Sequence, residues 1–579
     1  MKNSKRLIAL VLSLSLLFSV CGCREIRWTA KDDEIEYYYT TSDIINEEET
    51  STYSFPYETL DEADFTVSSH LPGEFALISP NRLSLICNSV RPEFKWSVSE
   101  WAESYILIVE QYDSKTQTFN ELFRESGIET TTYTVKRDLP ESEILRWCVV
   151  AQNKYGKKYS SGVNDNYYEA FISYVDSKNH PATAGMDFKF DYKISREVLC
   201  NYLSRAVTAA DDLTFLSLDN LKSISILNNV LYTGAKYVSR AGCVWTPRMK
   251  EINSMPGQKE FIALAHKYDP DIIFEACLFE NVDGNVNEIP IPDWVFRAFG
   301  LTPEKRNFNF GKIVHSGSTI PDMTKLEAQM LFYYRGTLYI DAGYEAFHMG
   351  QIDIISSKEY GTWECTAKVF NMLRDYANKN ARRHFILINA HTPYNDNKSY
   401  VSTLDNKLIY DFICFPLRAT TNESTPHPPS ANKPQTQYLK VGNGDSLFGR
   451  AFGGGMTHSG WYAETLPYYI EFDNASNTNG LLDIPTPNIA VNWGRDDIGW
   501  FASQPASYRS YWLDYAYSWL KELKNEYNED AFVCMPIFRP ATPYGYTSRT
   551  FYDASCNLLS SNGYSDIFAI RDIWIKNNS

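Results

Sequence analysis

The sequence predicts an α/β protein: a (β/α)8 TIM-like barrel preceded by a small β-sandwich. From residue 179 to residue 579, continuous apolar segments of strand length alternate with amphipathic segments of helix length. Such strands are typical of a parallel sheet that is buried on both faces. About eight strand–helix units in ~400 residues suit a closed barrel with long loops. Between residues 71 and 178, short alternating strands and turn-rich spacers favour a sandwich.

The composition is that of a folded, acidic protein. The chain has 579 residues, of which 44% are hydrophobic and 22% charged, and its formal net charge is −16. These fractions are near globular averages, so most of the chain can bury a core. At ~150 residues per domain the length corresponds to roughly four domains, a count that barrels and sandwiches often undercut. The acidic balance argues against a nucleic-acid partner, because phosphate binding needs clustered Lys and Arg.

The amino terminus has the pattern of an export signal. Lys2, Lys5 and Arg6 precede an apolar run of 14 residues, 7–20. A membrane span needs ~20 apolar residues, so this run is short for one. Since no other segment approaches that length, we expect the remainder of the chain to be soluble and to lie outside the cytoplasm.

A cysteine motif follows the apolar run. Val20-Cys21-Gly22-Cys23 resembles a bacterial lipobox, in which a small residue precedes the cysteine that is diacylated and becomes the new amino terminus. The resemblance implies lipidation of Cys23, which follows Gly22. Lipoprotein processing attaches more than one chain, as a stable anchor requires. We therefore expect a signal peptide at residues 1–23 and a protein anchored by lipid to the bacterial membrane at the cell surface. The alternative is an ordinary secretory signal with incidental cysteines.

Residues 24–70 are expected to form an acidic stalk. They include Asp32-Asp33-Glu34 and Glu47-Glu48-Glu49 and have no apolar periodicity. Such a composition cannot offset the entropy lost on ordering, which predicts a flexible segment.

The cysteines do not form a recognisable framework. Removing Cys21 and Cys23 from the total of 11 leaves nine, an odd number without CxxC or another metal spacing. Most of them stand inside apolar strands, where Cys acts as a small hydrophobe. We therefore expect buried free thiols.

The segment 71–178 resembles a fibronectin type III domain of the kind found in bacterial polysaccharide-degrading proteins. Trp96 on one predicted strand precedes Tyr105 on the next, and Trp147 lies on a strand that continues to Asn153 and Gly156. In that family a Trp packs under such a Tyr, and a W-x-V-x-A-x-N-x-x-G strand follows. The resemblance implies the fold of this domain and says little about function, since such modules are usually spacers or glycan-contacting accessories.

The elements of the domain at residues 179–579 follow from hydrophobic periodicity. The predicted strands are 236–245, 271–279, 310–315, 338–348, 384–391, 408–415, 468–472 and 531–538. The predicted helices are 221–231, 258–268, 294–299, 325–334, 362–380 and 508–526. A doubly wound open sheet is the alternative. Neither GxGxxG nor GxxxxGK[ST] follows the first strand, which weakens the nucleotide-binding versions of that fold.

Two carboxylates stand where predicted strands end, and the functional groups of a barrel project from the carboxyl ends of its strands. The segment 338–351 turns from apolar to polar at Glu345, His348 and Gln351. These three are spaced three apart, so they share a face only if the chain turns helical there. The alternative is a buried hydrogen-bond network that braces the barrel mouth. The segment 467–474 is apolar up to Glu471.

This placement resembles the large superfamily of barrel glycoside hydrolases. If 310–315 is strand three, Glu345 ends strand four and Glu471 ends strand seven. In that superfamily the acid/base Glu follows strand four and the nucleophile Glu follows strand seven, so the resemblance implies these roles for Glu345 and Glu471. The Asn that usually precedes the acid/base Glu is replaced by Tyr344.

Glycoside hydrolysis needs two carboxylates, one that protonates the leaving oxygen and one that attacks the sugar or activates water. Four other carboxylates are alternative partners in this pair: Glu275 and Glu280 around the second predicted strand, Asp411 on the sixth, and Asp473 beside Glu471. The substrate-binding candidates lie at strand ends or in the two loops 449–462 and 492–501, whose Trp side chains suit sugar rings or else cap the barrel. They are Arg240, Glu275, His348, Gln351, His391, Trp461, Asp473, Asn474, Trp493, Asp496, Trp500 and Arg539. Asn389 is a further neighbour at a strand end.

The segments 339–351, 381–391 and 471–474 together resemble glycosidase-like surface proteins of gut-type anaerobic bacteria. We therefore expect a cell-surface lipoprotein that hydrolyses glycosidic bonds of an extracellular polysaccharide or oligosaccharide through a carboxylate pair. The expected partners are a carbohydrate and the membrane, with no cofactor and no metal. The alternative is a non-catalytic glycan-binding lipoprotein whose barrel is inactive.

Two other hydrolase classes fit less well. A metal-dependent hydrolase using Asp341, His348 and His391 lacks the His-x-His of the amidohydrolase type, because the first predicted strand has Ser239-Arg240-Ala241, and no HExxH occurs. A serine hydrolase would need GxSxG, which the sequence does not contain.

Overall fold

The structure is a computed structural model. It describes residues 70–81, 85–162, 167–209, 216–391, 399–417, 429–430, 432–439, 453–472, 497–541, 543 and 550–578. The predicted signal peptide with Cys23 and nearly all of the predicted stalk lie outside these residues. Across the described ranges, no helix combines the length and the apolar character that a membrane crossing requires.

The first described part is a β-sandwich, as predicted. One antiparallel sheet pairs β1 (Leu77–Ser79), β2 (Glu93–Trp96) and β5 (Thr132–Thr134). The other contains β4 (Thr118–Ile128), β3 (Ser104–Asp113), β6 (Ile144–Asn153) and β7 (Gly156–Tyr159), and β8 (Glu169–Ile172) also pairs with β6. The core holds Trp96 and Tyr105, with ring centroids 5.5 Å apart, and Trp147. The Trp–Tyr contact expected from the sequence is therefore present, whereas the assignment to the fibronectin type III family stays a prediction.

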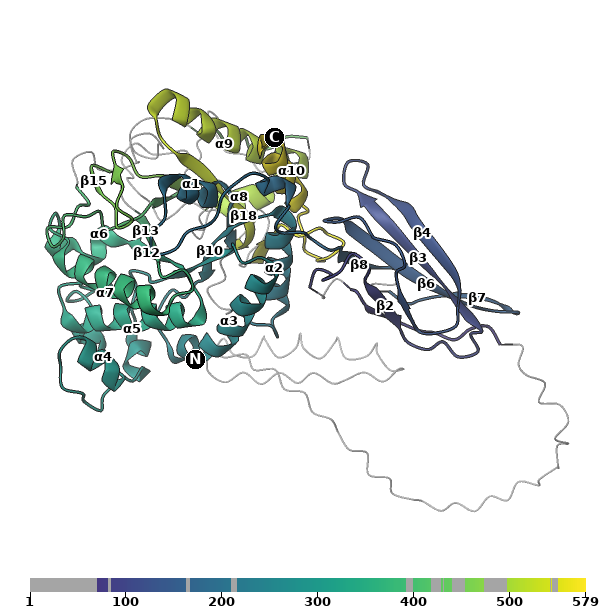
Figure 1. The fold of residues 1–579 in the computed structure, drawn as a ribbon, viewed down its shortest axis with the longest axis horizontal. Helices are drawn as coiled ribbons and strands as arrows, with labels where there is room; N and C mark the ends of the chain where they lie inside the picture. The colour runs from purple at the N-terminus through teal and green to yellow at the C-terminus, as the bar shows by residue number, and fades with distance from the viewer. Residues whose placement is uncertain are drawn as a thin grey trace, which may run out of the picture. The chain divides into compact units, whose positions relative to one another are not determined.

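The second part is a closed barrel of eight parallel strands (Figure 1). In chain order they are β9 (Ala206–Ala209), β10 (Tyr237–Gly242), β11 (Ile273–Cys277), β12 (Ala346–Gln351), β13 (Leu387–His391), β14 (Ile413–Pro416), β17 (Tyr468–Glu471) and β18 (Ala531–Ala541). Each strand pairs with its neighbours in this order, and β18 pairs with β9, which closes the sheet. The predicted (β/α)8 barrel is confirmed, and the open doubly wound sheet is excluded.

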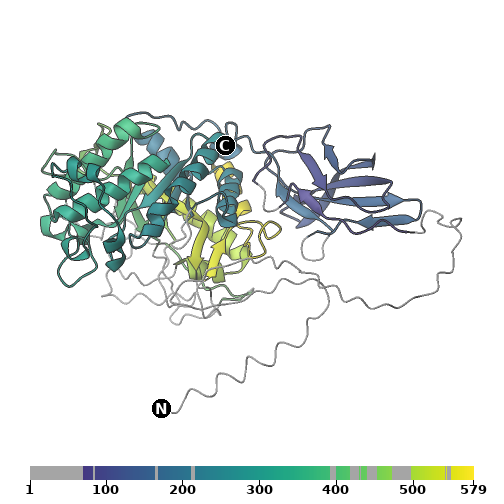
Figure 2. The ribbon, with the colours of Figure 1, turned by 90° about the horizontal axis from the view of Figure 1, so that it is seen from below.

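Helices cover the outside of the strands. The longer ones are α2 (Leu221–Thr233), α3 (Met249–Tyr268), α5 (Leu326–Ala342), α7 (Glu364–Asn380), α9 (Ala506–Tyr527) and α10 (Ile567–Asn578). Helices α3, α5 and α7 pack side by side in that order (Figures 1 and 2). In α7 the buried Ala367, Phe370, Leu373 and Ala377 recur every three or four residues, so they form one apolar stripe toward the strands.

Shorter elements close the barrel and extend it. They are α1 (Arg196–Ser204), α4 (Asp293–Ala298), α6 (Ile352–Ile355), α8 (Asp497–Ser503), the hairpin of β15 (Gly455–Met456) and β16 (Tyr462–Ala463), and β19 (Thr550–Asp553), which pairs antiparallel with β18. The described residues also include the 3-10 turns η2 (Pro181–Thr183), η3 (Gly284–Glu288), η4 (Phe310–Lys312) and η5 (Ser357–Glu359). Leu199 and Tyr202 of α1 share one buried cluster with the first residues of β9 to β13, so α1 closes the amino end of the barrel.

Two strand predictions need correction, and one strand was not predicted. The segment 310–315 is not a strand, since η4 occupies Phe310–Lys312. The first strand, β9, was missed because it has only four residues. The predicted strand 338–348 is wrong in its first half, because α5 continues to Ala342 and ends at Gly343 with a left-handed φ of 101°. The false strand and the missed strand cancel, so the numbering of strands four to eight holds.

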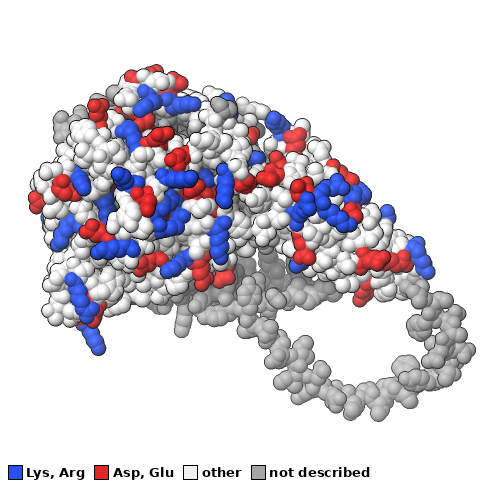
Figure 3. Space-filling view, in the orientation of Figure 1, with Lys and Arg blue, Asp and Glu red and all other residues white. Residues whose placement is uncertain are grey.

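The predicted free thiols are confirmed. All nine cysteines of the described residues are free, and most of them are buried. On the face seen in Figure 3, the basic and acidic side chains of the described residues are interspersed. This face therefore gives no support to a nucleic-acid partner.

Candidate functional site

A cluster of charged side chains gathers around Glu471 at the carboxyl end of the barrel. Glu471 is the last residue of β17, the seventh strand, as the sequence predicted, and it is fully buried. Its Oε1 atom forms an ion pair with Arg240 on strand two and lies 3.1 Å from His391 Nε2 on strand five. Its Oε2 atom lies 3.3 Å from Arg539 Nη1 on strand eight, and Cys414 Sγ on strand six lies 3.4 Å from Oε1. Four strands therefore converge on one carboxylate.

The surroundings hold Glu471 as an anion. Burial alone would raise the pKa of this carboxyl group. The charge of Arg240, the hydrogen bond with His391 and the charge of Arg539 outweigh burial and place its pKa well below the ordinary value. Glu471 is therefore a desolvated but ionised carboxylate at neutral pH, with two guanidinium groups as its counter-ions.

Arg240 is fixed by an uncommon backbone conformation. Its φ is 57°, in the left-handed region that residues other than Gly seldom adopt. Its backbone N–H donates to Glu275 Oε1 at 3.0 Å, and its Nη2 atom lies 3.0 Å from His391 Nε2. This conformation turns the Arg240 side chain away from the regular strand direction, so that it reaches His391 on strand five and Glu471 on strand seven.

Glu275 forms a second polar layer inside the barrel. It lies in the middle of β11, fully buried, and accepts hydrogen bonds from Tyr237 Oη, from Ser239 Oγ (3.0 Å), from Asn389 Nδ2 (2.7 Å) and from the Arg240 N–H. Burial raises its pKa. Because Glu275 stands in the middle of its strand and not at the carboxyl end, these four bonds brace the strands beneath Arg240.

His348 on strand four belongs to the same layer. Asn389 donates its amide N–H to Glu275, so its Oδ1 atom accepts from His348 Nδ1 at 2.8 Å. This bond makes Nδ1 the protonated nitrogen and leaves Nε2 as an acceptor. Burial lowers the pKa of His348 well below the ordinary value, so the imidazole is neutral.

Three of these side chains have the chemistry of a metal site. One potential ligand atom from each of His348, His391 and Cys414 lies within 4.8 Å of the others, and two nitrogens with one sulfur suit Zn²⁺. Arg240, however, already places its guanidinium against His391 Nε2 and Glu471. The cluster therefore has its cation, and a second one would be repelled by the arginine.

Glu345, the predicted partner of Glu471, lies at the opposite end of the barrel. It stands directly before the first residue of β12, and its carboxylate pairs with Arg382 Nη2 (2.7 Å) and Arg383 Nε (3.2 Å). Its predicted place at the carboxyl end of strand four is wrong, because α5 extends further than the sequence pattern indicated. Glu345 therefore belongs to an ion-pair network at the amino end of the barrel, where such contacts serve stability.

Several other candidates are also placed away from Glu471. Asp411 precedes β14 and pairs with Arg374 at 3.1 Å, near the amino end of the barrel. Trp461 donates its indole N–H to Ile194 O at 3.0 Å, beside α1. Trp500 is fully buried in α8 with its rings 5.4 Å from those of Trp512. Both tryptophans make packing contacts away from Glu471, and their predicted binding of substrate stays a prediction.

The remaining predicted residues divide into two sets. Gln351 ends strand four, and its backbone N–H donates to Glu280 Oε2 at 3.1 Å. Four others lie outside the described residues: Asp473, Asn474, Trp493 and Asp496.

Two residues of the site were not predicted from the sequence, Cys414 and Tyr469. The Oη atom of Tyr469 lies 2.8 Å from Ser239 Oγ. The sequence placed both residues on predicted strands, but their apolar neighbours indicated only that they belong to the hydrophobic core.

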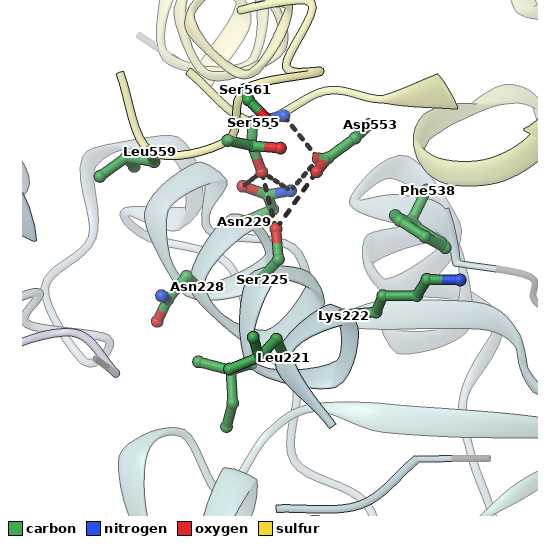
Figure 4. Close-up of a pocket in the computed structure, with 12 residues that line it drawn as sticks. Leu221, Lys222, Ser225, Asn228, Asn229, Phe538, Asp553, Ser555, Leu559 and Ser561 are labelled. Carbon is green, nitrogen blue, oxygen red and sulfur yellow. Dashed lines mark hydrogen bonds between the residues drawn. The ribbon is translucent and has the colours of Figure 1, made fainter. Parts of the chain in front are cut away.

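A separate cavity of about 220 Å³ lies between α2 and β19 (Figure 4). Asn229 donates to Ser555 Oγ at 2.9 Å and to Asp553 Oδ1 at 3.4 Å, and the Ser555 N–H donates to Asp553 Oδ1 at 2.9 Å. These polar groups bond to one another across the wall of the cavity. These hydrogen bonds therefore link α2 to the segment after β19.

Comparison with known proteins gives a limited likeness. No protein-family model matches the sequence, and no curated protein matches it. Among solved structures, the chain is similar to the β-glucuronidase of Faecalibacterium prausnitzii, with 7% identity over 87% of this chain and 66% of that one at a TM-score of 0.32. The β-glucuronidase of Ruminococcus gnavus in complex with N1-substituted uronic isofagomine gives 10% identity over 86% and 67%, at a TM-score of 0.28.

A β-D-glucuronidase of Dictyoglomus thermophilum matches with 14% identity and a TM-score of 0.20, over 59% of this chain. The chain spans only 46% of the length of that enzyme. At identities and TM-scores this low, the matches transfer no residue role, substrate or reaction to this chain.

Replacing Glu345 by Gln tests its assignment to the amino-end network. The amide keeps the shape but removes the charge that faces Arg382 and Arg383, so we expect a loss of about 1–3 kcal/mol in the free energy of unfolding. Urea denaturation measures this loss. The ion pairs around Glu471 should be unaffected, and any turnover per folded molecule should stay within twofold of the parent. A selective loss of turnover at unchanged stability would contradict the assignment.

Replacing Arg240 by Met tests the ion pair with Glu471. Removing one partner of a buried pair leaves the other charge uncompensated and costs about 3–5 kcal/mol. The lowered pKa of Glu471 contributes stability above its unfolded value, and this contribution is lost as the pH falls through the folded value. Without Arg240 the folded pKa rises, so we expect the acid-induced loss of stability to begin at a higher pH. Urea denaturation across a pH series measures both effects, and the double variant with Glu471→Gln should recover part of the lost stability.

Proposed function

We propose that this protein hydrolyses glycosidic bonds and that Glu471 is the carboxylate that meets the anomeric carbon of the sugar. The observation that carries the proposal is a buried, anionic carboxylate at the carboxyl end of strand seven, held by Arg240, His391 and Arg539. An oxocarbenium-like transition state develops positive charge at the anomeric carbon, and a preformed anion stabilises that charge. The barrel presents such groups at this end of its strands.

The charge environment favours one of the two roles that a carboxylate can take. A general base works best when its pKa is near the working pH, whereas the pKa of Glu471 is well below the ordinary value. Such a group is a poor proton acceptor for water but remains ionised and available as a nucleophile. We therefore propose Glu471 as the nucleophile of a retaining hydrolase.

A second candidate function is glycan binding without hydrolysis. The observation that favours it is the end of strand four, where Gly350 and Gln351 stand in place of an acid. An amide side chain does not protonate a leaving group. A barrel that has kept Glu471 but has no acid would bind a sugar and release nothing.

We also propose that the barrel works outside the cytoplasm, attached through a lipid on Cys23. The support is the sequence alone: a basic start, a 14-residue apolar run at 7–20 and a small residue before the cysteine. A membrane-attached barrel would meet large extracellular glycans without being lost by diffusion.

Replacing Glu471 by Gln separates hydrolysis from binding. We expect the parent protein to release reducing sugar from at least one member of a panel of polysaccharides and oligosaccharides, and the variant to lose roughly 10⁴-fold or more in kcat/KM, because the nucleophile is gone. Reducing-sugar assays and affinity electrophoresis on the same glycans measure turnover and binding. Binding by both proteins with release by neither would support the glycan-binding alternative. A thermal melt checks that the variant is folded.

Replacing Cys23 by Ser tests the anchor. We expect cells that express the parent protein to incorporate an alkyne-labelled fatty acid into it, and the variant to lose the label and move to the soluble fraction. Cys21→Ser is the matched control and should keep both the label and the membrane fraction. Equal labelling of all three proteins, or none in the parent, would refute the anchor.

A further inference from the structure

A second buried carboxylate lies close to the carboxyl end of strand four, although it belongs to the chain that leaves strand three. Glu280 stands three residues after Cys277, the last residue of β11, and is only 5% exposed. Its Oε2 atom accepts the backbone N–H of Gln351 at 3.1 Å. Gln351 is the last residue of β12, so the carboxyl group of Glu280 occupies the place where a side chain of strand four would otherwise stand.

A glycine, Gly350, leaves room for the carboxyl group of Glu280. Gly350 has a left-handed φ of 58°, and a methyl group on its Cα atom would collide with Oε2 of Glu280. The backbone conformation and the present position of the Glu280 carboxyl group therefore both favour glycine at this position. The carboxyl group of Glu280 therefore lies against the backbone of strand four, where its own N–H and the N–H of Gln351 donate to it.

Contacts across two strands connect Glu280 to Glu471. Glu280 contacts the backbone of Gln351, and Gln351 is the direct neighbour of His391 in the pairing of strands four and five. His391 Nε2 in turn lies 3.1 Å from Glu471 Oε1. The two carboxyl groups therefore belong to one cluster at one end of the barrel.

Their environments push the two groups in opposite directions. Burial raises the pKa of Glu280, and the Gln351 N–H and the charge of Arg240 lower it by less. The pKa of Glu471 is lowered by Arg240, His391 and Arg539. Glu280 therefore favours the protonated form where Glu471 is ionised, which is the division that an acid and a nucleophile need.

Three other carboxylates that the sequence suggested do not fit the position of an acid. Glu275 is held by four donors inside the barrel. Glu345 and Asp411 are paired with arginines toward the amino end. Among the carboxylates that the sequence suggested and the structure describes, only Glu280 is left at the carboxyl end beside strand four.

We propose that Glu280 is the general acid of this barrel, supplied by the chain after strand three to the position at the end of strand four. The proposal rests on the proposed hydrolysis by Glu471. Glu280 gives its proton to the glycosidic oxygen while the bond from that oxygen to the anomeric carbon breaks, and the bonding electron pair stays on the oxygen. The leaving group departs as an alcohol, and Glu471 forms an ester bond to the anomeric carbon.

The second half of the reaction restores both groups. Water attacks the anomeric carbon, and the Glu280 carboxylate accepts the proton of that water. The ester bond breaks, its electron pair returns to Glu471, and the sugar leaves with a new hydroxyl group. The net reaction consumes one water per bond and needs no other reactant.

The dependence on the leaving group tests this role. The probes are 2,4-dinitrophenyl and methyl glycosides of glucose, galactose, mannose, xylose and glucuronic acid in both anomeric forms, compared with the glycans that the parent cleaves. A dinitrophenolate is a good leaving group that departs without a proton, whereas the oxygen of a methyl glycoside must be protonated as it leaves. We expect Glu280→Gln to lower kcat/KM by roughly 10²–10⁴-fold on methyl glycosides and glycans but by less than tenfold on the dinitrophenyl glycosides.

Two further readouts distinguish catalysis from a structural role. The alkaline limb of the pH profile of kcat/KM, which reports the acid, should disappear in Glu280→Gln. Azide should restore turnover of dinitrophenyl glycosides by Glu280→Ala as a glycosyl azide. An equal loss on both kinds of glycoside, with an unchanged pH profile, would overturn the proposal.

The glycine beside Glu280 gives an independent variant. Gly350→Ala should displace the carboxyl group of Glu280 and reproduce the leaving-group dependence of Glu280→Gln. Gly361→Ala is the matched control, because Gly361 also has a left-handed φ of 89° but a methyl group there meets nothing within 4 Å. If both alanine variants behave alike, the contact between Gly350 and Glu280 does not position the general acid, and this part of the proposal is overturned.

The outcomes separate this proposal from the proposed function. Loss of turnover in Glu471→Gln together with full activity of Glu280→Gln on methyl glycosides leaves the hydrolase standing and overturns the role of Glu280. A parent protein that cleaves none of the glycosides and glycans overturns both.

Discussion

The ion pair between Arg240 and Glu471 is the interaction on which the rest of the site depends. It joins strand two to strand seven across the barrel, where both side chains are removed from water. A buried carboxylate without a counter-ion would take up a proton, and a buried arginine without one would destabilise the fold. Each group therefore keeps the other ionised, and His391 and Arg539 complete a shell that holds Glu471 in one orientation.

The barrel separates its charges into layers along its axis. Charged groups occupy the carboxyl end, and Glu275 beneath them is surrounded by hydroxyl, amide and backbone donors. A separate set of ion pairs, including Glu345 with Arg382 and Arg383, ties the amino end. The two ends thus carry the same residue types for different physical tasks, one to hold a reactive anion and the other to fasten the strands.

Sequence reasoning found the barrel and the position of Glu471, because the residues before Glu471 form an uninterrupted apolar strand that stops at the carboxylate. It misplaced Glu345, because the second half of α5 is as apolar as a buried strand and shows no break before Gly343. Glu280 was one of several open alternatives. Its place is set by a contact with strand four, distant in sequence, which no local periodicity reports.

The glycine under Glu280 also links two positions that are separated by 350 − 280 = 70 residues. Position 350 cannot accept a side chain while the carboxyl group sits against it, and it is released from that exclusion once position 280 carries a smaller residue. Evolutionary drift should therefore couple the two columns of an alignment. Chains with Glu at the first position keep Gly at the second, and chains that have lost this Glu can carry Asn or Asp at the second, since these residues also tolerate a left-handed φ. The pair would then sort relatives of this barrel by chemistry before any of them is assayed.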